Sequence, residues 1–282
     1  SKSIFLDCGV ANERNFNILK SIFLYPLGSN VLIFIMALKI DKKILSWALY
    51  DWGNSAFSTT VMAGFFPVFF KQYWSQGVDS TISTARLGTV ISIGSIIIAF
   101  MSPTLGALSD QRGTKKLFCF LFMALGLIGC TWLGFIDSGA WFIACIAYGL
   151  AMMGFNASTV FYESLLPSVA PGNKANFASS LGYALGYLGG GVLFTFNVLM
   201  YLFPAKFGLS DGVTAVKLSF ISVALWWGFF SIPLYKNVPE PDYFHNPSPL
   251  WQATIDGFKT ILKTFSKIKT DKKNIFIFII AY

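Results

Sequence analysis

Residues 46–70 read SWALYDWGNSAFSTTVMAGFFPVFF, and this stretch decides the fold. It is almost wholly apolar over a length that can cross a bilayer, because a membrane-spanning helix needs roughly 20 mostly apolar residues at about 1.5 Å per residue. Its one charged side chain, Asp51, lies inside the apolar run. The stretch predicts a transmembrane helix that begins near Ile44 and carries an acid within the membrane.

The composition of the whole chain is typical of a polytopic membrane protein. Of 282 residues, 55% are hydrophobic and only 12% are charged, whereas a soluble domain carries about 25% charged residues. The four cysteines form no CxxC pair and have no partner histidines, so we expect no disulfide framework, no metal and no cofactor. The net charge of +8 resides in loops between apolar runs, and we expect no nucleic-acid partner.

Gaps between charged residues define the spans. Six gaps are long enough, namely residues 52–70, 87–109, 117–136, 138–162, 175–205 and 218–235. Fourteen Lys and Arg residues flank one side of these spans and four flank the other, which are Lys71, Arg86, Lys206 and Lys217. The side that is richer in basic residues is expected in the cytoplasm. Both ends of the six-span region are therefore predicted to be cytoplasmic.

The regions outside the spans complete the domain organisation. Residues 1–35 are either a doubtful leader upstream of a start at Met36 or an extra hydrophobic segment, and residues 36–235 form the six-helix bundle. Residues 236–273 are predicted to be a basic cytoplasmic linker, which suggests a boundary between two bundles. Residues 274–282 begin a seventh apolar run that is too short to span, so we expect a truncated helix there.

The linker contains a periodic apolar pattern. Its apolar members are Leu250, Ile255, Phe258, Ile261, Leu262, Phe265 and Ile268, and they recur at helical spacing opposite Lys259, Lys263 and Lys267. This pattern predicts an amphipathic helix at the cytoplasmic membrane surface.

The loop between the second and third spans, residues 106–116, reads GALSDQRGTKK. Its spacing also suits an ordinary basic loop that fixes topology. The pattern resembles the G-x-x-x-D-x-x-G loop of the major facilitator superfamily, which Gly106, Asp110 and Gly113 match, with Lys115 and Lys116 following. Gln111 and Thr114 stand where that family often has a basic residue. The resemblance implies that Asp110 takes part in a latch between two bundles.

Three further segments narrow the resemblance, which covers about residues 40–282. They are YDWGNSAF (50–57), FYESLLPSVAP (161–171) and SSLGYALGYLGGG (179–191), and together they resemble the vacuolar amino-acid effluxer family associated with autophagy and its bacterial relatives. The resemblance implies the first six-helix half of a twelve-helix transporter, whose partner is the missing C-terminal half. It also implies amino acids or similar small polar solutes. The fourth span has no arginine of the kind that many proton-coupled superfamily members carry, so proton coupling is not implied by that route.

Asp51 is the strongest candidate for a functional residue. Asp51, Asn54, Ser55 and Ser58 follow at i, i+3, i+4 and i+7 and so share one face of the first helix. A charged side chain inside a membrane helix costs roughly 2.5 to 3.5 kcal/mol, which favours a position facing the bundle interior or a water-filled cavity. The alternative is a packing role, in which Asp51 accepts hydrogen bonds from neighbouring helices or pairs with a loop lysine.

The fourth and fifth spans carry further candidates. Tyr148, Met152, Asn156, Thr159 and Glu163 form a stripe on the fourth span. Of these, Tyr148 and Asn156 are candidates for solute contact, although Asn156 can equally tie two helices together. Glu163, at the cytoplasmic end, is assigned to the latch. The fifth span repeats Gly182, Gly186 and Gly190 every four residues, which predicts a close helix-packing surface, and Tyr183 and Tyr187 are additional candidates for solute contact.

We expect a secondary transporter that moves a small solute by alternating access, in contact with membrane lipid and completed by a second bundle. The alternatives are a seven-helix receptor or channel, and a membrane-embedded enzyme. The enzyme is disfavoured because the sole histidine, His245, lies in the linker. The bacterial cytoplasmic membrane is the expected location, or a vacuolar membrane if the source is eukaryotic.

Overall fold

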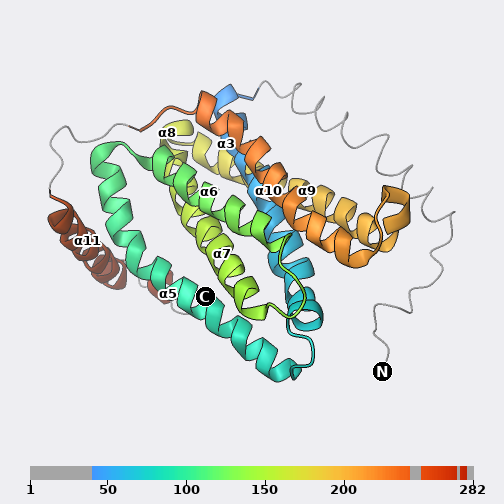
Figure 1. The fold of residues 1–282 in the computed structure, drawn as a ribbon. Coiled ribbons are helices and arrows are strands. Elements are labelled where there is room, and N and C mark those ends of the chain that lie inside the picture. The colour runs from blue at the N-terminus through green and yellow to red at the C-terminus, as the bar shows by residue number, and fades with distance from the viewer. Residues whose placement is uncertain (1–39, 242–248, 272–273, 278–282) are drawn as a thin grey trace. The chain divides into compact units, whose positions relative to one another are not determined.

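The computed structural model describes residues 40–241, 249–271 and 274–277 (Figure 1). The chain divides into two compact units, Ser1–Lys42 and Lys43–Tyr282, and the helical bundle is the second. Residues 1–35, His245 and the end of the seventh apolar run lie outside the described residues.

Every regular element in the described ranges is a helix, which confirms the all-α polytopic class. Five helices in these ranges are long and apolar enough to cross a membrane. They are α5 (Ser80–Arg112), α6 (Lys115–Leu133), α7 (Trp141–Ser164), α9 (Lys174–Leu202) and α10 (Gly212–Asn237). The short α8 (Leu166–Val169) and η3 (Pro204–Phe207) lie in the connections after α7 and α9. These helices cover the second to sixth predicted spans.

The first predicted span is helical throughout but is not one uniform α-helix. It consists of α3 (Lys42–Ala56), η1 (Phe57–Phe65), α4 (Phe66–Phe69) and η2 (Phe70–Trp74), of which η1 and η2 are π-helical. Phe66 N–H donates to the carbonyl of Val61, five residues back. Pro67 supplies a physical reason for the wider turns, because its ring lacks an N–H and clashes with the carbonyl four residues earlier.

The packing is tightest between α6 and α7, which lie side by side in Figure 1. A Cβ atom on Gly129 of α6 would lie 2.7 Å from the carbonyl oxygen of Ala147, and Gly126 meets Gly154 backbone to backbone. Glycine permits this close approach because it has no side chain. By contrast, α5 buries few of its side chains against the rest of the unit.

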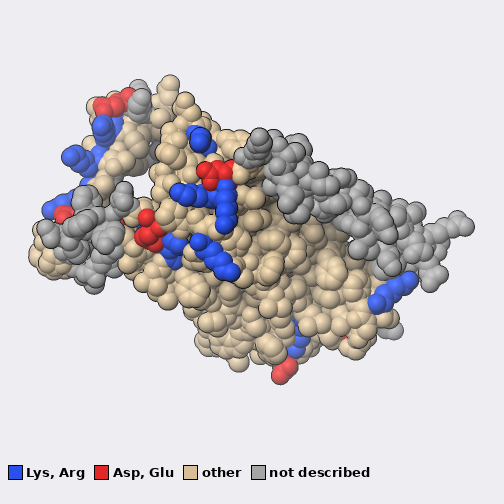
Figure 2. All heavy atoms as spheres, turned by 90° about the horizontal axis from the view of Figure 1, so that it is seen from above, with Lys and Arg blue, Asp and Glu red and all other residues tan. Residues whose placement is uncertain are grey.

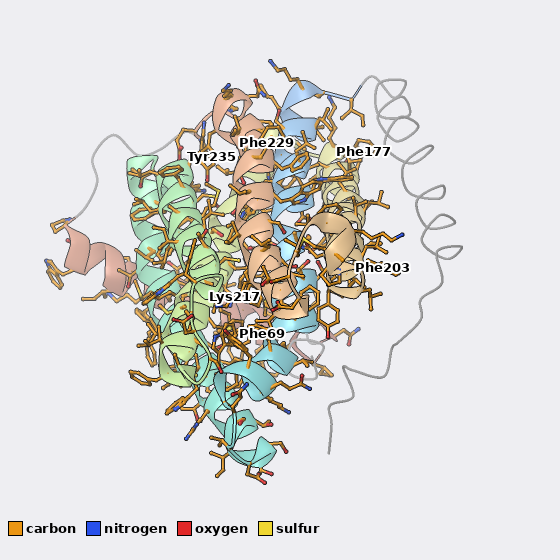
Figure 3. All side chains as sticks on the ribbon, turned by 45° about the vertical axis from the view of Figure 1, so that its right-hand side comes forward. Phe69, Phe177, Phe203, Lys217, Phe229 and Tyr235 are labelled. Carbon is orange, nitrogen blue, oxygen red and sulfur yellow. The ribbon has the colours of Figure 1, made fainter. Side chains whose placement is uncertain are left out.

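The basic side chains gather at one end of the bundle. Figure 2 shows Lys and Arg side chains on the end where α3 and α6 begin and α10 ends. In Figure 3, Tyr235 and Lys217 mark the two ends of α10, and Tyr235 lies at this basic end. That this end faces the cytoplasm stays a prediction.

Two aspartates and one glycine define helix ends. Asp79 accepts a 2.7 Å hydrogen bond from Thr81 N–H at the start of α5, and Asp211 accepts one of 2.7 Å from Thr214 N–H at the start of α10. Both bonds favour the charged carboxylate and hold its pKa below the ordinary value. Gly113 ends α5 with φ of 61°, in the left-handed region where glycine is favoured.

The amphipathic segment of the linker forms α11 (Leu250–Asp271). The helix spans the periodic apolar pattern of the sequence. Its location at a membrane surface stays a prediction.

Candidate functional site

Asp51 is half-buried on the side of α3 that faces the glycines of α9. Ser55 Oγ donates a long 3.5 Å hydrogen bond to its carboxylate. A Cβ atom on Gly186 would lie 2.7 Å from Ser55 Oγ and 3.2 Å from Asp51 Cγ, so this glycine makes room for both polar side chains. No ion pair to Asp51 occurs among the described side chains. The loop-lysine pairing considered from the sequence is therefore not seen there.

The other members of the predicted polar face of α3 have separate partners. Asn54 is buried, and its amide donates a 3.4 Å hydrogen bond to Thr159 Oγ1 of α7. Ser58 donates to the carbonyl of Ser55, within its own helix. Asp51 therefore contacts α9, whereas Asn54 ties α3 to α7.

Glu163 is the second carboxylate in this region. Its side chain, near the end of α7, is exposed. The neighbouring Tyr162 is buried and stacks on Trp47, with ring centroids 4.4 Å apart. The Tyr162 hydroxyl has no hydrogen-bond partner among the described atoms and would lie 3.4 Å from a Cβ on Gly182. Asp51 and the unsatisfied Tyr162 hydroxyl thus both lie near the glycine face of α9.

The remaining candidates for solute contact do not join this cluster through any described contact. Tyr148 is buried and stacks on Phe66, with centroids 3.8 Å apart. Asn156 is half-buried. Tyr183 and Tyr187 are 59% and 78% exposed, so both lie on the outer surface of α9.

The glycine stripe of α9 faces the first helix. Gly182, Gly186 and Gly190 approach Trp47, Asp51 with Ser55, and Thr59, respectively. Gly189 lies outside the four-residue spacing but approaches Trp52 closely. A Cβ atom on Gly189 would lie 2.6 Å from ring carbons of Trp52. Thr59, which sequence reasoning missed, donates to the carbonyl of Gly190 at 3.3 Å.

The loop residues that are assigned to the latch form a separate group. Lys115 pairs with Asp110 at 2.6 Å, Gly113 ends α5, and a Cβ atom on Gly106 would have no neighbour within 4 Å. No contact of Glu163 with this loop is described. The described contacts therefore group Asp110 with Lys115 and do not connect Glu163 to this loop.

Lys116 and Glu240 form a contact that sequence reasoning missed. Lys116 Nζ donates to the carbonyls of Tyr235 at 3.0 Å and Val238 at 2.6 Å, at the end of α10. The Glu240 carboxylate in turn accepts from Lys116 N–H at 3.2 Å, at the start of α6. We call this reciprocal contact the 116–240 clasp. The sequence pair Lys115–Lys116 and the distant Glu240 indicate only that these residues can form ionic contacts at the surface. They do not indicate that Lys116 and Glu240 contact each other.

The chemistry available to this group of residues is binding and proton exchange. Among the described residues, no group of three His, Cys, Asp or Glu side chains has metal-binding geometry. The partly buried carboxylate of Asp51 can accept hydrogen bonds or hold a cationic group.

Comparisons with known proteins identify the family. The family model described as "Vacuole effluxer Atg22 like" matches residues 40–282. The MFS-type transporter YxiO of Bacillus subtilis (strain 168) is 34% identical over 249 residues, which cover 88% of this chain and 57% of the relative. A protein of Aquifex aeolicus (strain VF5) is 30% identical over 156 residues, covering 55% of this chain and 38% of that protein.

The chain thus spans little more than half the length of its Bacillus relative. No solved structure matches it. The family match covers every helix from α3 to α11, and the chain belongs to the Atg22-like vacuole effluxer family of multi-pass membrane proteins.

Proposed function

We propose that the full-length protein is a secondary transporter that exports a small polar solute, with an amino acid as the first candidate. The proposal is supported by the family description as an effluxer and by the transporter name of the Bacillus relative. The same two findings favour a transporter over a seven-helix receptor or channel and over a membrane-embedded enzyme. Because both relatives are bacterial, we propose the bacterial cytoplasmic membrane as its location.

The observation that carries the site assignment is the half-buried Asp51 carboxylate, which has no ion-pair partner among the described side chains. A structural carboxylate inside a membrane protein is ordinarily paired with a base or with several donors. Here one long bond from Ser55 is the only described donor. An incompletely satisfied acid is suited to hold the ammonium group of a solute or to exchange a proton.

The mechanism that we propose is alternating access between two bundles. The described six-helix unit is the first bundle, and a second bundle, outside this chain, completes the site. The exposed ring of Tyr187 is then available to a cavity between the bundles. The close glycine contacts of α9 with α3 keep the first bundle rigid while it rocks.

Solute uptake into inside-out vesicles, in which export appears as uptake, tests the assignment of Asp51 in the full-length protein. Asp51→Asn keeps the shape of the side chain and removes its charge, so uptake should fall at least about tenfold, as for a lost charge-assisted contact. Asn54→Ala removes the hydrogen bond to Thr159. It should lower the stability of the protein, whereas the molecules that remain folded should keep most of their uptake rate. Asp137→Asn makes the same chemical change at a side chain that is 95% exposed and should leave uptake unchanged. Uptake by folded Asp51→Asn at the unmodified rate from pH 5 to 8 would show that the aspartate is structural.

A further inference from the structure

Arg86 is held against an aromatic ring in the second turn of α5. Its guanidinium carbon lies 3.7 Å from the centroid of the Trp141 ring, at the start of α7. A cation this close to an indole face is attracted by the π-electrons, and the flat guanidinium of arginine stacks well on such a ring. The two helices are packed against each other here, because a Cβ atom on Gly149 of α7 would lie 3.2 Å from Val90 Cγ1 of α5. The ring and the packing together restrict the positions that the guanidinium can adopt.

The guanidinium lacks a hydrogen-bond partner on its buried side. Arg86 Nη1 is shielded from solvent and has no partner among the described atoms. Removing an N–H donor from water without supplying an acceptor costs free energy, and the cost is larger for a charged group than for a neutral one. The described residues therefore leave a charged donor that a ligand can satisfy.

The acids at the same end of the bundle are engaged elsewhere. At this end, which Lys217 marks in Figure 3, the helices α5, α7 and α10 begin. Asp79 and Asp211 each accept an N–H bond at the start of their own helix, and Asp137 lies 3.6 Å from Lys217. No ion pair of Arg86 occurs among the described side chains. Arg86 is thus a partly buried cation for which the described residues supply no anion.

We propose that Arg86 binds a carboxylate of the exported solute at the end of the bundle that is predicted to face outside. A guanidinium presents two parallel N–H donors, which match the two oxygens of a carboxylate. The positive end of the α7 dipole, at Trp141, adds to the attraction for an anion. The identity of this ligand rests on the proposed export of an amino acid or similar solute. The site itself is separate from Asp51, which lies in the first half of the first span.

The two charges suit the two ends of an amino acid at different stages of export. Asp51 holds the ammonium group within the membrane, and Arg86 receives the carboxylate where the solute leaves. The account therefore assigns to the solute both an amine and a carboxylate, with one protein charge for each.

Binding of two leucine derivatives to the full-length protein tests the proposal. N-acetylleucine carries the carboxylate without a charged amine, and leucinamide carries the amine without a carboxylate. Saturation-transfer NMR in phosphatidylcholine nanodiscs measures the dissociation constant of each by titration. Arg86→Gln should raise the constant for N-acetylleucine at least about tenfold, as the loss of bonds to a charged group does. Arg86→Lys keeps the charge but loses the paired donors, so its increase should be smaller.

Two further variants separate this site from its surroundings and from Asp51. Lys71→Gln removes the same charge from an exposed side chain of η2 and should leave N-acetylleucine binding unchanged. Leucinamide binding should be weakened by Asp51→Asn and not by Arg86→Gln, so a failure of the Asp51 assignment is distinguishable from a failure of this one.

Three results would overturn the proposal. The first is unchanged N-acetylleucine binding by folded Arg86→Gln. The second is binding in dodecyl maltoside that disappears in the nanodiscs, because a lipid phosphate would then occupy Arg86. The third is the absence of N-acetylleucine binding in both media, and a lower melting temperature of Arg86→Gln would then assign the arginine to a structural ion pair with the second bundle.

Discussion

Gly189 and Gly191 lie two residues apart on α9 but have opposite surroundings. A Cβ on Gly189 would meet the carbonyl oxygen and ring of Trp52, whereas a Cβ on Gly191 would have open space within 4 Å. In the full-length protein, Gly189→Ala should lower the free energy of unfolding by about 1 to 3 kcal/mol through overpacking. Gly191→Ala should be neutral or stabilising by up to about 1 kcal/mol, because alanine favours helix. Thermal unfolding in detergent measures both, and equal melting temperatures would refute the described α3–α9 contact.

At the level of single residues, the sequence predicted which side chains share one face of a helix but not which side chains they contact on other helices. The 3.6-residue period correctly groups Asp51 and Ser55 on one side of α3. It cannot show that Asn54, one residue from Ser55, turns to Thr159 on α7. Nor does a four-residue glycine repeat reveal Gly189, because close contact depends on the crossing of two helices that are distant in sequence. Long-range packing decides these details.

The N-cap of α10 predicts a pH dependence at the scale of one element. Asp211 has a lowered pKa in the folded protein because its carboxylate accepts the Thr214 N–H bond. Its contribution to stability is present above the unfolded pKa of about 3.9 and is lost as the pH falls through the lower folded pKa. Asp211→Asn retains a capping acceptor without titrating, so its stability should fall less between pH 6 and 3 than that of the unmodified protein. Chemical unfolding measures the stability of both proteins at each pH. An equal loss of stability in both proteins would contradict the proposed cap.

The 116–240 clasp joins the start of α6 to the end of α10. Lys116→Met removes the bonds to the carbonyls of Tyr235 and Val238, and Glu240→Gln weakens the reciprocal bond. Each should cost about 1 to 3 kcal/mol, as bonds to charged groups do. The double variant should cost less than the sum, because the two contacts share one junction. Faster hydrogen exchange at residues 235–241 would report that this segment has been released. If the free-energy costs of the two single variants add up to that of the double variant, the two contacts act independently.

At the level of elements, counting charge-free gaps predicted the helices well. The gap 175–205 corresponds to α9 at Lys174–Leu202, and 218–235 lies within α10. The method works because a bilayer demands long apolar helices with charges at their ends. The π-helical turns at Phe57–Phe65 were not predicted, since hydropathy has no term for the local effect of Pro67 on backbone hydrogen bonds.

The topology of the whole bundle makes a labelling prediction. Six crossings are predicted to return the chain to the side where it began, so the loops near Val78 and Leu209 should face outside and those near Gly113 and Lys259 inside. Single cysteines at Val78 and Leu209 should react with a membrane-impermeant thiol reagent added outside intact cells. Cysteines at Gly113 and Lys259 should react only after permeabilisation. Strong outside labelling at position 113 would overturn the topology.

Alternating access is the central claim, and labelling at Ser55 tests it most directly. Ser55 lies beside Asp51 and is half-buried, so a cysteine there reports when the site opens. The measurement uses the full-length Ser55→Cys protein, with its native cysteines replaced, in right-side-out and inside-out vesicles treated with an impermeant thiol reagent. Alternating access predicts labelling from both sides, slowed in each case by saturating solute. Labelling from one side only, in protein that still transports, would contradict a site at Asp51 that opens alternately to the two faces of the membrane.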